Sequence, residues 1–252
     1  MGPERPGPAV SEPLSLTVLG CDGSYPGPGG SCSGYLLRCG GTTVLLDAGP
    51  GTLARLQEHL AITDLDAVVV SHEHVDHWSD LEHLAVACHY IIQRPPVPLY
   101  CEADLVARMR VGPAAAALTW VRVDPGARVD VGAMTFTFSR TDHTVDTLAV
   151  RVDGGGRSLG YSADSGPAWG LEHLGAGLDL ALCEATFLSD REGSLSHLSG
   201  RQAGTSAHAA GVKRLVLTHQ LPGVDRQAVL AEAEAAFGGP AELATVGRRY
   251  LV

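Results

Sequence analysis

Six consecutive positions of this 252-residue chain contain four side chains that commonly bind metal ions. They are His72, His74, Asp76 and His77, and they follow residues 67–70, an apolar and β-branched run that predicts a buried strand. A strand that ends in a tight turn can direct all four side chains into one cavity. Imidazole and carboxylate ligands suit zinc, iron or manganese better than they suit calcium. We therefore interpret the segment as a metal site rather than as a polar loop rich in histidine.

Composition indicates a globular protein with an ordinary apolar content of 45%. We expect residues 1–13 to form a disordered lead-in and residues 14–252 to form a single domain. The N-terminal segment lacks the apolar run of a signal peptide, and no run approaches the length of a membrane span. The six cysteines form no Cys-x-x-Cys pair, which favours reduced, mostly buried thiols in a cytoplasmic protein.

The formal net charge of −10 disfavours long nucleic acids as partners. Proteins bind such polyanions through basic stripes, whereas here Lys213 is the only lysine and the arginines are scattered. A small anionic substrate is compatible with this charge, because bound metal would supply local positive charge.

Strand and helix patterns alternate along the chain after residue 13. Strands are expected at residues 14–19, 35–38, 43–46, 67–70, 97–101, 134–139, 148–152, 158–162, 178–183 and 212–218. Helices are expected at residues 51–60, 80–92, 103–109, 202–210 and 226–237. Two β-rich halves with interspersed helices predict two packed sheets flanked by helices, although periodicity alone does not separate this from other α/β architectures.

Three further ligand candidates follow predicted strands, where loops on rigid scaffolds carry functional residues. They are His143, Asp164 and His219. Alone, each is more often a satisfied polar residue than a ligand. Together with the first cluster they make five imidazoles and two carboxylates, which is enough for two metals that share one aspartate.

The ordered set of histidines and aspartates from His72 to His219 resembles that of the metallo-β-lactamase-fold hydrolases. The resemblance runs from about Leu14 to the C-terminus and implies an α/β fold, a four-layer αββα sandwich. Three segments are similar to the phosphodiesterase branch, which includes the tRNase Z endonucleases: residues 18–24, 183–187 and 197–203. Overall the chain looks most like the atypical class II cyclic nucleotide phosphodiesterases of actinobacteria.

One difference from the tRNA endonucleases narrows the range of substrates that we expect. Those enzymes carry a long tRNA-binding arm between the positions that match His143 and Asp164. Here these residues are only 21 positions apart, and a predicted hairpin fills the interval. The chain has no room for the arm, which favours a small phosphodiester. Secreted β-lactamases of this fold use a cysteine ligand, so the histidine-aspartate set also disfavours antibiotic hydrolysis.

The resemblance implies two divalent metal ions, with zinc favoured and manganese or iron suited to the same ligands. The residues implied to bind the first ion are His72, His74 and His143. Those implied to bind the second are Asp76, His77 and His219, with Asp164 bridging both. A hydroxide between the metals would attack phosphorus in line, and Asp76 could orient or deprotonate it.

His197 aligns with the family's catalytic histidine and is the candidate acid that protonates the leaving group. Glu184 would orient it through a hydrogen bond. The alternatives are a solvated loop histidine and a surface carboxylate at a strand end. The glycine-rich segment 20–34 is interpreted as a flexible loop rather than a phosphate cradle, because it lacks the required spacing. In the family it borders the active site, which makes Ser31 and Ser33 candidates for substrate contact.

The function predicted from the sequence is a dinuclear metal phosphodiesterase that acts on a small substrate such as a 3′,5′-cyclic nucleotide. The alternatives are an RNA-processing nuclease without the arm, a thioester or lactone hydrolase of the same fold, and a non-catalytic metal-binding module. No membrane partner is expected, and relatives are often homodimers.

Overall fold

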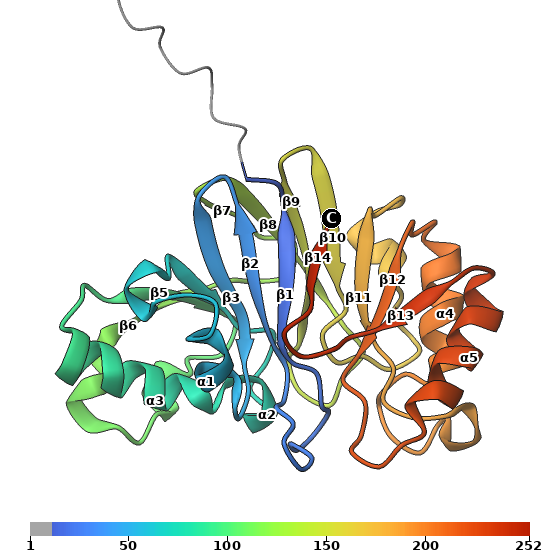
Figure 1. Cartoon of the computed structure of the whole chain (residues 1–252), viewed down its shortest axis with the longest axis horizontal. Coiled ribbons are helices and arrows are strands. Elements are labelled where there is room, and N and C mark those ends of the chain that lie inside the picture. Colours follow the sequence, from blue (N-terminus) through green and yellow to red (C-terminus); the bar gives the residue numbers. More distant parts are fainter. Residues whose placement is uncertain (1–11) are drawn as a thin grey trace, which may run out of the picture.

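The computed structural model describes residues 12–252, in which two seven-stranded sheets pack face to face (Figure 1). Most of the predicted lead-in, residues 1–11, lies outside the described residues. In spatial order, the first sheet consists of β14 (Arg249–Leu251), β1 (Ser15–Gly20), β2 (Gly34–Cys39), β3 (Thr42–Ala48), β4 (Ala67–Val69), β5 (Val97–Cys101) and β6 (Leu118–Arg122).

The second sheet repeats the design of the first. In spatial order it consists of β13 (Ala241–Leu243), β12 (Leu215–Thr218), β11 (Leu180–Glu184), β10 (Arg157–Tyr161), β9 (Leu148–Gly154), β8 (Met134–Arg140) and β7 (Arg128–Val131). Each sheet joins an antiparallel part, β14 to β3 or β7 to β10, to a parallel part, β3 to β6 or β10 to β13.

Helices cover the outer face of each sheet and complete four layers, which confirms the predicted αββα sandwich (Figure 1). The first sheet carries α1 (Thr52–Leu56), α3 (Asp80–Val86) and the π-helical continuation Ala87–Ile92. The second carries α4 (Gly200–Ala209) and α5 (Arg226–Phe237). A further short helix, α2 (Val75–Trp78), lies at the edge between the sheets. None of the described helices is long and apolar enough to span a membrane.

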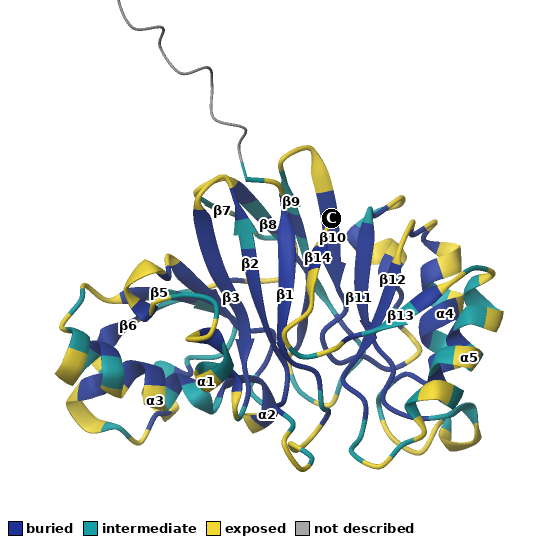
Figure 2. Cartoon of the chain, viewed as in Figure 1, coloured by how far each residue is buried: buried dark blue, intermediate teal, exposed yellow. Residues whose placement is uncertain are grey.

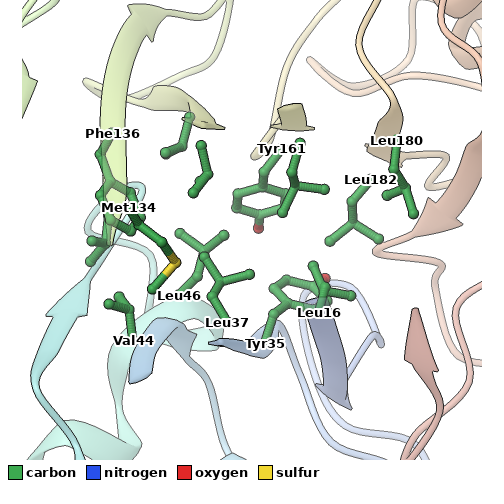
Figure 3. Packing of buried hydrophobic residues seen from close by; sticks show 14 of the residues in the cluster. Leu16, Tyr35, Leu37, Val44, Leu46, Met134, Phe136, Tyr161, Leu180 and Leu182 are labelled. Atoms are coloured by element: carbon green, nitrogen blue, oxygen red, sulfur yellow. The ribbon is translucent and has the colours of Figure 1, made fainter. Parts of the chain in front are cut away.

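The main core lies between the two sheets, whose central strands, such as β1 to β3 and β11 to β12, are almost wholly buried (Figure 2). Aliphatic side chains of β1 to β3 meet Met134, Phe136 and the leucines of β11 (Figure 3). Two tyrosines cross this core and bond to the opposite sheet. Tyr35 lies 2.6 Å from Thr218 Oγ1, and Tyr161 donates to Asp47 Oδ2 at 2.7 Å. These bonds fix the sheets relative to each other near the edge where the candidate ligands lie.

Most predicted elements are confirmed, with corrections in the middle of the chain. Residues 103–109 were expected to be helical, but only the 3₁₀ turn Val106–Arg108 forms. So short a segment rarely sustains an α-helix, because nucleation fixes several residues for one hydrogen bond. The sequence did not reveal β6 and β7, whose side chains are partly exposed. All six cysteines are free and buried, as expected: Cys21, Cys32, Cys39, Cys88, Cys101 and Cys183.

Candidate metal centre

The side chains of the predicted ligands lie close together. Two of them belong to α2, which lies at one edge of the sandwich (Figure 1). The loop after β4 carries two of them, and α2 carries the next two. The others follow β8, β10 and β12, so both sheets contribute. The loop ends of strands in two facing sheets thereby bring together residues far apart in the chain: His72, His74, Asp76, His77, His143, Asp164 and His219.

The atoms of the seven candidate ligands form two groups along the lines of the predicted partition, and a third cluster brings His197 together with Asp164 and His219. In each, the candidate ligand atoms lie within 4.8 Å of one another. The outer group, in which two of the three histidines are partly exposed, consists of His72, His74 and His143 together with the shared Asp164. The inner group, which is wholly buried, consists of Asp76, His77 and His219.

Asp164 lies between the two groups and presents one oxygen to each. Its Oδ2 lies 3.5 Å from His72 Nε2 and 3.8 Å from His143 Nε2. Its Oδ1 lies 3.3 Å from His77 Nε2 and 3.4 Å from His219 Nε2. The carboxylate is 2% exposed, and the neighbouring imidazoles outweigh the effect of burial and hold its pKa well below the usual range. A carboxylate in this position can bridge two cations.

The donor atoms fit bound cations. Two buried atoms, His77 Nε2 and Asp164 Oδ1, have no hydrogen-bond partner within residues 12–252. An orphaned buried polar atom costs roughly 1–3 kcal/mol unless a ligand meets it. In the outer group, His74 Nδ1 lies 3.1 Å from His72 Nε2 and 3.2 Å from His143 Nε2. Burial lowers the pKa of His72 and of His143, which favours the neutral, metal-binding form of these rings.

In three of the imidazoles, the fold determines which ring nitrogen is free to bind a metal. His77 Nδ1 bonds to Asp47 Oδ2 at 2.8 Å, and His143 Nδ1 bonds to the Ser196 carbonyl at 3.0 Å. Thr186 Oγ1 lies 3.1 Å from His219 Nδ1. With Nδ1 held in this way, Nε2 of each ring faces the centre, which is the usual arrangement for a metal-binding histidine.

Asp47 is the main supporting residue that sequence reasoning missed. It is fully buried, and besides His77 and Tyr161 its carboxylate accepts hydrogen bonds from the backbone and hydroxyl of Ser71, at 2.7 and 2.9 Å. Burial alone would lower the pKa of His77, but the charges of Asp164 and Asp47 outweigh it and raise that pKa well above its ordinary value. The one sequence signal for Asp47 was an acidic residue at the end of an apolar strand.

Left-handed backbone also concentrates at this edge. Asp47, Ala163 and His219 have φ values of 56°, 51° and 55°, a conformation that non-glycine residues seldom adopt. Such strain is maintained only where surrounding structure enforces it, often at functional sites. Gly23 makes a related close approach, since a Cβ added there would lie 2.6 Å from the His219 carbonyl oxygen.

His197 and Glu184 form the predicted pair beside the centre. His197 Nδ1 lies 3.1 Å from Glu184 Oε1, and the carboxylate also accepts from the backbone amides of Ser165 and Leu198. Burial by itself lowers the pKa of His197, but the Glu184 carboxylate outweighs it and raises this pKa to about 9. Glu184 is fully buried, so it is not the surface carboxylate considered as its alternative.

An open cavity of about 370 Å³ lies against the centre, within the common size range of small-molecule sites. The lining residues are Ser24, Glu73, His74, Val75, Asp76, Asp164 and His197. The glycine-rich loop reaches this cavity through Ser24, whose amide donates to Asp76 Oδ2 at 2.8 Å. Ser31 and Ser33, the candidates for substrate contact, are buried and do not line this cavity, and Ser31 Oγ donates a hydrogen bond to the Leu19 carbonyl.

The hairpin predicted between His143 and Asp164 is confirmed. The strands β9 and β10 pair in antiparallel register and are joined by a glycine-rich turn. The interval that carries an arm in the tRNA endonucleases is therefore filled by two strands of the second sheet.

Comparison with known proteins identifies the family. Residues 42–220 match the family described as the Beta-lactamase superfamily domain. An uncharacterised protein of Mycobacterium tuberculosis is 37% identical over 244 residues, which cover 90% of this chain and 88% of that protein. A ribonuclease Z of Mycobacterium avium is 28% identical over 251 residues, which cover 83% of this chain and 86% of that enzyme.

The probable metallo-hydrolase YhfI of Bacillus subtilis is similar in both sequence and structure. It is 30% identical over 241 residues, which cover 93% of this chain and 98% of YhfI. The crystal structure of YhfI, described as a metallo-β-lactamase fold protein, superposes with a TM-score of 0.86 over 95% of this chain and 99% of YhfI. The chain therefore belongs to the beta-lactamase superfamily and is a metal-dependent hydrolase of its phosphodiesterase and tRNase Z branch.

Proposed function

We propose that this chain is a dinuclear metal phosphodiesterase that hydrolyses a small phosphodiester, with a 3′,5′-cyclic nucleotide as the favoured substrate. The observation that carries the proposal is Asp164, whose two oxygens face two separate groups of imidazoles. The outer and inner groups would each bind one divalent cation, and zinc suits their nitrogen and oxygen donors well. When bound, two such cations supply Lewis acidity that polarises a phosphoryl group and activates water near neutral pH.

The proton transfers are assigned to two residues that line the cavity. Asp76 Oδ2, held by the Ser24 amide, would accept a hydrogen bond from the attacking water and orient it. His197 would donate the proton on Nε2 to the leaving alkoxide, since Glu184 holds its Nδ1. The buried Glu184 carboxylate keeps this imidazole protonated near neutral pH, as a general acid requires.

Two observations support a small substrate. The cavity of about 370 Å³ suits a ligand of nucleotide size. The acidic chain, with a formal net charge of −10, has few cations with which to bind a long nucleic acid. The similarity to a ribonuclease Z favours a second candidate, an RNA-processing phosphodiesterase that works without the arm. The His197–Glu184 pair favours either phosphodiesterase over a thioester or lactone hydrolase, which has no evident need for an acid of this kind.

A substrate panel tests the proposal. The metal-loaded protein would be assayed with cyclic AMP, bis(p-nitrophenyl) phosphate, a precursor tRNA, a glutathione thioester and a lactone. We expect hydrolysis of the cyclic nucleotide and of the chromogenic diester. Cleavage of precursor tRNA without cyclic AMP hydrolysis would establish the second candidate instead. Activity confined to the thioester or the lactone would contradict both.

A further inference from the structure

One carboxylate on the wall of the cavity has no part in the proposed metal centre. Glu73 lies between two proposed ligands in the chain, and its side chain lines the same cavity as Asp76 and Asp164. Its backbone carbonyl accepts a hydrogen bond from Trp78 Nε1 at 2.9 Å, which fixes the loop that carries it. The side chain is 29% exposed, so its charge faces both the cavity and the solvent.

Arg108 binds this carboxylate from a different loop. Its Nη2 lies 2.7 Å from Glu73 Oε2, and it belongs to the 3₁₀ turn Val106–Arg108 that follows β5. In the described part of the chain, this ion pair is the only polar contact of either side chain. A guanidinium has five N–H donors, so most of those on Arg108 remain free. With 51% of the Arg108 side chain exposed, water weakens the compensation of one charge by the other.

The ion pair places a negative charge at the cavity wall and a positive charge behind it. The two carboxylates of the cavity that belong to the metal centre would be neutralised by their cations. The Glu73 carboxylate would keep its charge, because no proposed ligand group includes it. A ligand with one phosphate charge satisfied by the centre meets little repulsion, whereas a further phosphate in the same cavity lies close to this carboxylate. Repulsive groups of this kind are a common source of specificity.

We propose that the Glu73–Arg108 pair selects ligands by charge: it admits a singly charged phosphodiester and rejects a ligand that carries an additional phosphate group. Glu73 supplies the repulsion, and Arg108 limits it by partial neutralisation. The inference rests on the proposed function, because it assumes that phosphate esters bind at this centre. It names the substrate class more narrowly than the fold does.

Equilibrium binding gives the test without turnover. Calorimetry on the metal-loaded protein would measure the dissociation constants of adenosine 5′-monophosphate and adenosine 3′,5′-bisphosphate, which differ by one phosphate. The ratio of the second constant to the first expresses the discrimination. Glu73→Gln should lower this ratio about fivefold, the effect of one charge pair at about 4 Å in water. Arg108→Ala should raise it by a similar factor, because it leaves the Glu73 charge uncompensated.

Matched controls distinguish selection by charge from a structural change at the wall of the cavity. Glu82→Gln and Arg110→Ala remove the same charges nearby, where the Arg110 amide donates to Glu82 Oε1. Neither residue lines the cavity, so we expect both variants to keep the wild-type ratio and the wild-type metal content. Added salt should reduce the change of the dissociation-constant ratio in the two test variants, since the charges are partly exposed.

Changes of the dissociation-constant ratio in opposite directions in Glu73→Gln and Arg108→Ala would support the proposal. A purely structural ion pair is broken by either substitution and would change the ratio in the same way. Shifts in the same direction, or unchanged ratios in both variants, would overturn it. A different result would contradict the proposed function but not charge selection: the metal-loaded protein binds these nucleotides but hydrolyses no phosphodiester. In that outcome the two ratios still decide whether the pair selects by charge.

Discussion

The inner and outer groups of the candidate metal centre differ in how deeply the fold buries them. Every member of the inner group is buried and anchored by a separate residue. The Ser24 amide binds Asp76, Asp47 binds His77, and Thr186 contacts His219. In the outer group the Ser196 carbonyl also holds His143, but His74 and His143 are partly exposed, and His74 lines the cavity.

This difference indicates that the two groups, which share the Asp164 carboxylate, would have different roles. A buried, anchored group retains its ion, because ligands that are already oriented lose little entropy on binding. A partly exposed group leaves room for substrate to approach. We therefore expect graded chelation to remove the outer ion first, with Asp164 coupling the two losses.

The largest expected effect comes from the residue that both groups share. Asp164→Ala should remove both ions and reduce turnover of bis(p-nitrophenyl) phosphate on the order of 10⁴-fold or more, as loss of one member of a cooperating catalytic set does. Elemental analysis and steady-state kinetics would measure the two effects. A variant that still binds two ions per chain would show that Asp164 does not join the groups.

His197 lies outside both groups and should separate catalysis from metal binding. His197→Ala should lower turnover of cyclic AMP by about a hundredfold to a thousandfold, the range for loss of a general acid. The loss on bis(p-nitrophenyl) phosphate should be smaller, because p-nitrophenolate leaves without a proton. Metal content should stay at the wild-type level. Loss of metal instead would make His197 a ligand rather than an acid.

Asp47 tests the anchoring of the inner group directly. Asp47→Asn should weaken metal affinity of the inner group by about 10- to 100-fold, the usual effect of removing a partner of a metal ligand. The outer group should change less. Competition with a chromogenic chelator would resolve the two affinities. Asp66→Asn is the matched control, since Asp66 binds Thr43 away from the centre. Equal weakening of both groups would contradict the comparison.

The smallest effect, a change in stability, is expected at a surface cluster of three charged residues far from both groups. Lys213 and Arg157 bind Asp179, and these hydrogen bonds, with Lys213 the main contributor, hold the pKa of Asp179 below its ordinary value. This cluster of three charges therefore stabilises the fold fully above about pH 4, and the effect is lost gradually as the pH falls from that value through the lowered pKa of Asp179. Asp179→Asn should reduce stability at pH 6 by about 1 kcal/mol or less, since both cations are exposed.

Urea unfolding of wild type and Asp179→Asn at pH 6 and pH 3 would measure this difference. The difference in unfolding free energy between the two proteins should be smaller at pH 3 than at pH 6, and both proteins should bind the same amount of metal at pH 6. A stability difference that is equal at both pH values would show that the charge of Asp179 is not its cause.

The contiguous part of the candidate centre was predictable from sequence, because four candidate ligands, three histidines and one aspartate, follow one strand pattern. His143, Asp164 and His219 were predictable because strand patterns precede them, and strand ends of packed sheets converge. Asp47 was not, since its role depends on Tyr161, which lies 114 positions away on the opposite sheet.

The Glu73–Arg108 pair at the wall of the cavity could not be predicted from sequence, for a related reason. The Glu73–Arg108 pair depends on the path of the segment after β5, which was expected to be a helix and instead forms a short 3₁₀ turn. Periodic patterns identify elements that bury one face in the core. They carry little information about irregular segments, whose position is set by the elements around them.

Titration of the metal-depleted protein with Zn²⁺ tests the central claim most directly, with cyclic AMP hydrolysis measured at each step. The proposed bridged centre predicts that activity rises until two equivalents of metal are bound per chain, with little activity at one equivalent. Full activity at a single equivalent, or no hydrolysis of cyclic AMP at any metal content, would contradict a dinuclear cyclic nucleotide phosphodiesterase.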